Sequence, residues 1–172
     1  MATLHHSISG ELTKQLLAPG DNVNISKISL TNTQKVSKCK VDLYIEKKLT
    51  GKFYLLKGVE LPIGATLIYD DIKFSNTSEN FGLYIKLTDG ATFTLTGSID
   101  VTGTNVNVPG TNTLFLSELS VGDEVVISGE TRTVATITSN TAATVTAAFG
   151  SDLANDATPD CNPTALVDVI IN

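Results

Sequence analysis

Apolar residues alternate with polar ones along most of this 172-residue chain, and this period of two most constrains how it can fold. The segment Thr92-Phe93-Thr94-Leu95-Thr96 shows the pattern in its simplest form. Successive side chains of a β-strand point to opposite faces of a sheet, so an alternating segment buries one face and exposes the other. The chain is also rich in threonine, valine and isoleucine, whose branched side chains suit a pleated, half-buried surface. The pattern predicts an all-β protein.

The first 90 residues form a series of such segments, separated by the Gly, Pro, Asn and Asp residues that mark strand ends. In the segment 38–46, Val41, Leu43 and Ile45 share one face, and Asp42 and Tyr44 lie on the other. The alternation slips in phase at residues 26–27, which predicts a bulge there. The expected strands are 5–8, 12–17, 23–32, 38–46, 53–57, 66–69 and 81–87.

After Gly90 the segments become shorter and richer in threonine. Segments 124–127, 131–137 and 143–147 are joined by the tight turns 128–130 and 139–140, which predicts a three-stranded meander. Residues 150–163 are polar, and we expect no strand there. Residues 164–172 are expected to form one more strand, with Val167, Val169 and Ile171 on one face.

The last strand indicates the domain organisation. The segment 84–90 ends in a turn without a hairpin partner nearby, and the segment 165–171 has the length and apolar content of that partner. If the two pair, residues 91–163 are inserted at a hairpin tip, where insertions are best tolerated. We therefore predict an outer domain, 1–90 plus 164–172, folded as a jelly-roll-like or immunoglobulin-like β-sandwich. The inserted acidic β module, 91–163, is expected to be a small barrel or meander.

The charge distribution supports the same boundary. All eleven lysines lie in residues 1–90, together with nine acidic residues, whereas residues 91–172 carry nine acidic residues and one basic residue, Arg132. The chain is 41% hydrophobic and 17% charged, which excludes an intrinsically disordered protein. No apolar run approaches the ~20 residues of a membrane helix. The N-terminus lacks the basic and apolar blocks of a signal peptide, so we expect a soluble, non-exported protein.

Cys39 and Cys161 are far apart in sequence and form no CxxC pair, so they do not supply a disulfide framework or a metal site alone. The favoured interpretation is that both thiols are free, and a single disulfide between them is the alternative.

His5-His6 and the adjacent carboxylates Asp70-Asp71 and Asp123-Glu124 are the first candidates for chemistry. Neighbouring strand residues point to opposite faces, so the two histidines are interpreted as a surface pair rather than as metal ligands. The same geometry keeps adjacent carboxylates from facing each other across a glycosidase cleft. Either acidic pair contains oxygen ligands that suit calcium, but no DxDxDG-type loop is present, and solvated turns are favoured.

Asp152, Asp156 and Asp160 recur every four residues in the polar stretch 150–163. Calcium capture is one hypothesis. A flexible acidic connector back to the outer domain is the interpretation that we favour.

Seven lysines gather around the segments 38–46 and 53–57, against only Asp42 and Glu46. Such a cluster can follow a nucleic-acid backbone, but the chain contains one arginine and no aromatic-interleaved RNA-binding pattern. Docking on an acidic neighbouring subunit, or lysine protection of strand edges, is favoured. The lysines are Lys35, Lys38, Lys40, Lys47, Lys48, Lys52 and Lys57.

The chain contains no GxSxG, Walker A or dinucleotide motif, and neither histidine has the context of a catalytic triad. We therefore expect no enzyme, no catalytic, cofactor-binding or metal residues, and no cofactor.

Two stretches resemble known proteins. Residues 23–33, ending in SLTNT, together with VDLYI (41–45), the segment 53–67 ending in LPIGATL, and VDVII (167–171), resemble β-sandwich virion proteins of tailed bacteriophages, although here the closing strand follows an insertion. Residues 110–123 and 125–134 are similar to a small β module of phage tail and fibre proteins. The resemblance carries no catalytic residues.

The resemblance implies a virion structural protein, assembled in the bacterial host cytoplasm in many copies, as capsid decoration, neck or collar, or tail component. Its expected partners are copies of itself and other virion proteins that present an acidic surface to the lysine-rich face; membrane contact is not expected, and nucleic acid is disfavoured. The alternative is a host-surface adhesin or carbohydrate-binding module. Such modules display aromatic platforms, whereas Tyr44, Phe53, Tyr54 and Tyr84 lie in expected strands, where packing in a core or interface is commoner.

Overall fold

Strands dominate the structure, which is a computed structural model describing residues 3–10, 12–47, 50–70, 72, 74–76 and 81–172. Among these residues the only helix is the single turn α1 (Phe115–Glu118). The all-β prediction is therefore confirmed. The chain forms two compact units, and each is described by itself. Unit 1 comprises Met1–Gln34, Lys38–Asp89 and Ala165–Asn172, and unit 2 comprises Lys35–Ser37 and Gly90–Thr164.

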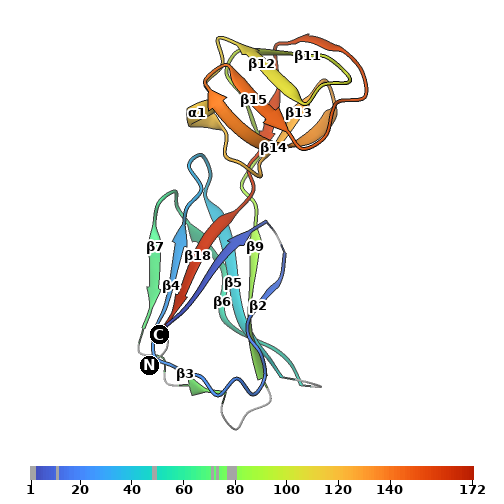
Figure 1. Cartoon of the computed structure of the whole chain (residues 1–172). Coiled ribbons are helices and arrows are strands. Elements are labelled where there is room, and N and C mark those ends of the chain that lie inside the picture. Colours follow the sequence, from blue (N-terminus) through green and yellow to red (C-terminus); the bar gives the residue numbers. More distant parts are fainter. Residues whose placement is uncertain (1–2, 11, 48–49, 71, 73, 77–80) are drawn as a thin grey trace. The chain divides into compact units, whose positions relative to one another are not determined.

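Unit 1 is a sandwich of two four-stranded antiparallel sheets (Figure 1). One sheet has the order β1-β18-β4-β7 and the other β2-β9-β5-β6, while β3 and β8 form a small separate pair. The strands are β1 (Leu4–Ser9), β2 (Lys14–Leu17), β3 (Asn24–Ile25), β4 (Ile28–Asn32), β5 (Cys39–Lys47), β6 (Gly51–Leu61), β7 (Thr66–Tyr69), β8 (Phe74–Ser75), β9 (Phe81–Thr88) and β18 (Leu166–Ile171).

The strand order identifies the type of sandwich. If the eight strands of the two large sheets are numbered along the chain, the sheets read 1-8-3-6 and 2-7-4-5. Almost every connection therefore crosses from one sheet to the other, which is the double Greek key of a jelly roll rather than the hairpin-rich order of an immunoglobulin sandwich. Unit 2 leaves the jelly roll between its seventh strand, β9, and its eighth, β18.

The space between the two sheets of unit 1 is filled by aliphatic side chains. Leu43, Leu83 and Ile85 from one sheet and Leu30 and Val169 from the other are fully buried members of one continuous core. Their positions follow from the alternation, because each is flanked in its strand by a residue that points outward. The sandwich is thus a solid, packed body.

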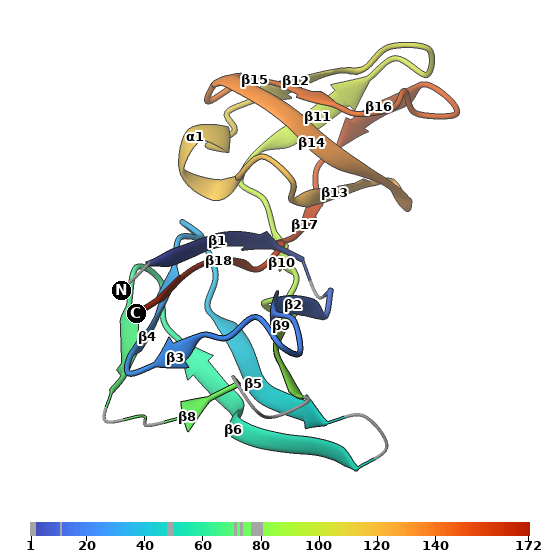
Figure 2. The same ribbon diagram turned by 60° about the horizontal axis from the view of Figure 1, so that its bottom comes forward.

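The pairing predicted for the last strand is wrong. Strand β18 pairs with β1 and β4, as Figure 2 shows for β1, whereas β9 pairs with β2 and β5. Both strands bury one alternating face, so their patterns fit any place in the same sandwich. Alternation does not specify the neighbour.

The phase slip at residues 26–27 ends β3 before β4 begins, and the amides of Ser26 and Lys27 both donate to the carbonyl oxygen of Asn172.

Unit 2 is built on one antiparallel run of eight strands, β10-β17-β13-β14-β15-β12-β11-β16. The predicted meander is confirmed as β13-β14-β15, and no pairing among the described residues closes the run into a barrel. Its core contains Phe115, Leu119 and Ile127. The strands are β10 (Phe93–Thr94), β11 (Ser98–Val101), β12 (Asn107–Thr111), β13 (Glu124–Ile127), β14 (Glu130–Ser139), β15 (Ala142–Val145), β16 (Leu153–Asp156) and β17 (Asp160–Asn162).

The absence of strands predicted for residues 150–163 is wrong, because β16 and β17 lie there. Strand β17 pairs with both β13 and β10, yet only Cys161 of its three residues is buried. A short strand held by backbone pairing with one inward side chain leaves no alternating signal. None of the helices in the described part of the chain is long and apolar enough to cross a bilayer.

Candidate interaction face

A row of four side chains crosses the outer surface of the sheet β2-β9-β5-β6. Gln15 is opposite Tyr84, Tyr84 is opposite Tyr44, and Tyr44 is opposite Tyr54, so each of the four strands contributes one residue. The alternation places them outward, because Leu43 and Ile85, adjacent to two of the tyrosines, point into the core. Directly opposed aromatic residues are the pairs that stabilise a sheet surface. We call this row and the lysines over it the tyrosine–lysine face.

The tyrosine rings contact one another across the strands. The centroids of Tyr44 and Tyr84 are 5.6 Å apart with planes inclined by 12°, and those of Tyr44 and Tyr54 are 5.5 Å apart at 51°. Tyr44 is therefore enclosed and only 2% exposed, although it lies on the outer side of the sheet. Tyr54, at the edge strand, is 44% exposed. At the other end of the row, Gln15 Nε2 donates to the Tyr84 hydroxyl at 3.0 Å.

Two lysines of β6 cover this row. Lys52 Nζ lies 4.6 Å from the Tyr44 ring centroid and donates to the Tyr44 hydroxyl at 3.3 Å. Lys57 Nζ lies 4.7 Å from the centroid of Tyr54. The hydrogen bond to Tyr44 raises the pKa of Lys52, so this ammonium stays charged. Attraction between an ammonium and an aromatic ring holds each charge over a ring while its remaining N–H groups reach solvent.

Gly82 shows how closely the row packs. A Cβ at this position would lie 2.8 Å from Tyr84 Cε2, 3.0 Å from the Leu17 carbonyl oxygen and 3.1 Å from Gln15 Nε2. The Tyr84–Gln15 end of the row therefore occupies the space that a larger residue needs.

Charge is unevenly shared between the two sheets of unit 1. The strands of the tyrosine–lysine sheet contain six lysines and three acidic residues, whereas the strands of the opposite sheet contain no lysine and one acidic residue, Asp168. Two of the three acidic residues in the first sheet have partners, since Asp42 Oδ1 accepts the Gly58 amide at 2.6 Å and Glu60 pairs with Lys38 at 3.0 Å. The third, Glu46, lies opposite Lys52 in the strand pairing. The six lysines are Lys14, Lys40, Lys47, Lys52, Lys57 and Lys86.

The predicted lysine cluster is only partly brought together. Lys40, Lys52 and Lys57 are exposed on the strands of this sheet, and Lys47 ends β5. Lys38 precedes β5 and binds Glu60, Lys35 belongs to unit 2, and Lys48 lies outside the described residues.

Sequence reasoning missed the tyrosines as members of the same surface. The signal that could have found them is the shared outward phase of Tyr44 and Tyr84, but it becomes visible only when their strands are known to be neighbours.

The members of the histidine pair and of the pair Asp123-Glu124 differ in burial. His5 is exposed, whereas His6 is half-buried, and burial lowers the pKa of His6. Asp70 is exposed, and Asp71 lies outside the described residues. Asp123 is fully buried and Glu124 is exposed, so this pair also divides between two faces.

Asp123 has a structural role in unit 2. Its carboxylate accepts the amide of Ser120 at 2.7 Å and the amide of Thr164 at 2.9 Å. It thereby fixes the last residue of unit 2 to the start of β13.

The three aspartates of the stretch 150–163 diverge. Asp152 accepts the amide of Gly103, Asp156 accepts bonds from Ser128 and Thr158, and Asp160 accepts the hydroxyl of Thr94. Burial alone would raise the pKa of Asp156, yet these bonds hold it below its usual value. The flexible-connector interpretation is wrong, since the segment contains two strands and its carboxylates are engaged. No group of three or more metal-ligating side chains occurs in the part of the chain that the structure describes.

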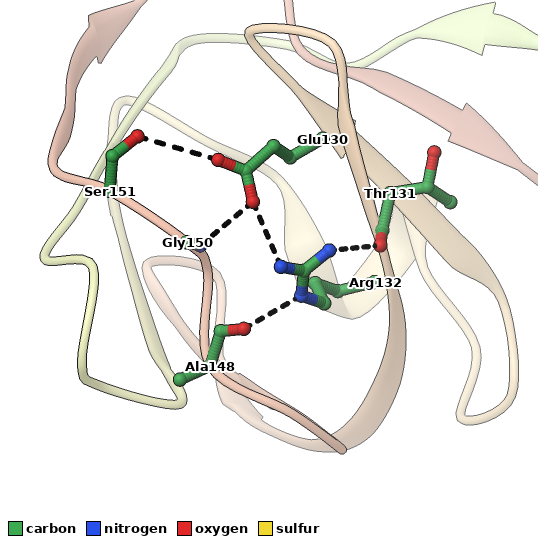
Figure 3. A network of polar contacts seen from close by, with 6 residues as sticks. All are labelled: Glu130, Thr131, Arg132, Ala148, Gly150 and Ser151. Atoms are coloured by element: carbon green, nitrogen blue, oxygen red, sulfur yellow. Dashed lines mark hydrogen bonds and ion pairs between the residues drawn. The ribbon is translucent and has the colours of Figure 1, made fainter.

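Arg132, the only arginine, is used inside unit 2 (Figure 3). Its guanidinium donates to Glu130 Oε2 at 2.8 Å, to the Thr131 carbonyl at 2.7 Å and to the Ala148 carbonyl at 2.8 Å. The same Glu130 oxygen accepts the Gly150 amide at 2.8 Å. The network therefore ties the residues after β15 to the start of β14.

Both cysteines are free and buried, as favoured from the sequence. Burial, with a smaller contribution from Asp89, raises the pKa of the Cys39 thiol to about 11. Burial next to Asp123 also raises the pKa of Cys161. Both thiols are therefore protonated and unreactive near neutral pH.

Comparisons with known proteins give a weak structural neighbour. No family model matches the chain, and no curated protein matches it. The crystal structure of the STIV major capsid protein overlaps 99% of this chain and 96% of that chain, at 10% sequence identity and a TM-score of 0.19. An overlap at this TM-score carries no argument about function. The site must therefore be interpreted from its own chemistry.

Proposed function

We propose that this chain is a structural protein of a tailed-bacteriophage virion, present in many copies as capsid decoration, as a neck or collar component, or as a tail component. The architecture of unit 1 supports this proposal, because jelly rolls recur in viral capsid proteins, lectins and cupins. The bacteriophage assignment comes from the sequence resemblance of residues 23–67 and 167–171. No catalytic role is part of the proposal.

The observation that carries the proposal is the tyrosine–lysine face on a solid sandwich. An interior cavity for a small ligand is not formed between the sheets in the described part of the chain, because Leu30, Leu43 and Ile85 are buried members of the core there. The outer surface instead presents tyrosines and ammonium groups. Tyrosine is enriched among the residues that contribute most to protein–protein binding, because a rigid ring buries much area at a small entropic cost. The face fits a protein neighbour that is acidic around its rim.

Immunogold electron microscopy of intact particles from the source lysate tests this function. An antibody to the chain is expected to label particles at a regular position. Gold on heads would indicate decoration, and gold at the vertex or tail would indicate a neck, collar or tail component. Protein found only free or in cell debris would overturn the proposal. Antibody absorbed with the purified chain serves as the control for specificity.

A host-surface adhesin or carbohydrate-binding module is the second candidate, and the exposure of Phe53 (50%) and Tyr54 (44%) favours it. Sugar rings stack on free aromatic faces. Here both faces of Tyr44 are taken by its neighbours, and Lys57 lies over Tyr54. A glycan array separates the candidates: selective binding that disappears in Tyr54→Ala would favour the adhesin, and an array without binding would count against it.

A further inference from the structure

The unit 2 surface is acidic, and the molecule therefore carries a complement to its own tyrosine–lysine face. Unit 2 contains eight acidic residues against Lys35 and Arg132. Arg132 is engaged with Glu130 inside the unit. Asp100, Glu124 and Asp152 are exposed, so the negative charge reaches solvent.

The opposite charge is concentrated at one place in unit 1. The strands of the tyrosine–lysine sheet hold six lysines against three acidic residues, and Asp42 and Glu60 among these are engaged with Gly58 and Lys38. The opposite sheet of unit 1 is not basic, because its strands contain no lysine and one acidic residue, Asp168. Charge complementarity thus singles out one face of unit 1 and the whole of unit 2.

We propose that the tyrosine–lysine face of one copy binds the acidic unit 2 of a second copy. This inference rests on the proposed function, which requires many copies in one particle, and it names the partner of the face. Lys52 and Lys57 supply the charges at the contact, and Tyr54 supplies the exposed apolar area.

The geometry of such a contact has a consequence for assembly. The two surfaces are different, so the contact is heterologous, and each copy keeps one unused surface for the next. Heterologous contacts produce rings when the rotation closes and filaments when it does not. The proposal therefore predicts a series of oligomers or one closed ring, and the smallest such ring is a reciprocal dimer in which each face binds the other copy's unit 2.

Sedimentation velocity of the purified full-length chain at low and high ionic strength tests the contact. We expect association that grows with concentration and weakens as salt screens the charges. Lys52→Glu combined with Lys57→Glu should weaken association by about tenfold or more for each reversed charge. Lys27→Glu lies outside the strands of the tyrosine–lysine sheet, and it should leave association near its original strength, whereas either single reversal on the face, Lys52→Glu or Lys57→Glu, should weaken it.

A charge-swapped pair makes the test specific. Asp100→Lys combined with Glu124→Lys reverses charge on exposed positions of unit 2, in β11 and β13. This chain alone, and the Lys52→Glu/Lys57→Glu chain alone, should both stay monomeric. Mixed, they should associate again, because each supplies the charge that the other lacks. Circular dichroism of each variant verifies that it is folded.

A chain that stays monomeric at every salt concentration, or variants that associate as the original does, would overturn the self-contact. Gold on particles in the same study would leave the virion function standing with a different neighbour. Absence of gold would remove the function independently of the sedimentation result.

Discussion

Gly82 is the residue on which the Tyr84–Gln15 end of the tyrosine row depends. We expect Gly82→Ala to lower the free energy of unfolding by about 1–3 kcal/mol, because the new methyl group overlaps Tyr84 Cε2 at 2.8 Å and the Leu17 carbonyl oxygen at 3.0 Å. Urea unfolding of the variant measures this loss. Tyr84→Ala removes the nearest overlapping atom, so the losses of the two single variants should not add in the double variant. Strictly additive losses would contradict the packing described for Gly82.

Cys39 makes the stability of unit 1 sensitive to alkaline pH. Burial raises the pKa of this thiol from 9.0 to about 11. A raised pKa means that the folded state holds the proton more tightly, so the stabilisation is complete below pH 9 and is lost as the pH rises toward 11. We expect Cys39→Ala to show a shallower loss of stability than the original chain between neutral pH and about pH 10. Equal slopes in urea unfolding would contradict this assignment.

At the scale of the element, the Glu130–Arg132 network predicts a local effect in unit 2. Arg132→Lys keeps the charge but loses the planar fork that reaches Glu130 and two carbonyl oxygens. We expect a loss of about 1–3 kcal/mol in the unfolding of unit 2 and faster hydrogen exchange of the Gly150 amide, which bonds to the same carboxylate. Lys27→Arg is the control for an exchange of basic residues elsewhere. Unchanged exchange at Gly150 would contradict the role of the network.

Elements were predictable where a strand buries one alternating face. The segments 66–69 and 124–127 were placed with the bounds of β7 and β13, and the outward position of Tyr44 was placed correctly. Strands β16 and β17 were missed because backbone pairing holds them with few inward side chains. The neighbours of β9 and β18 were wrong because alternation gives the face of a strand and says nothing of its partner. The tyrosine row was missed for the same reason, since it exists only through the pairing of four strands.

At the scale of the whole molecule, the chain passes from unit 1 to unit 2 at residues 89–90 and returns at residues 164–165. The geometry at these two points decides whether unit 1 can be produced without the residues between them. The amide of Ala165 donates to Asp89 Oδ1 at 2.6 Å, so the two residues of unit 1 that flank the segment 90–164 lie side by side. The adjacent amide of Thr164 donates to Asp123 of unit 2 instead. Thr164 and Ala165 are thus held by different units. The end of β9 and the start of β18 lie close enough to be joined by a short loop.

We predict that joining Gly90 directly to Thr164 leaves a folded jelly roll. The core of unit 1 is drawn from its own two sheets, and none of its members lies between residues 90 and 164. Loss of a long connection also lowers the entropy cost of closing the loop between β9 and β18. Circular dichroism should show a β spectrum with one cooperative unfolding transition. An unfolded product would mean that unit 1 requires unit 2. To separate that outcome from a strained junction, a second deletion that keeps three glycines between the same ends should be measured, and failure of both would overturn the independence of unit 1.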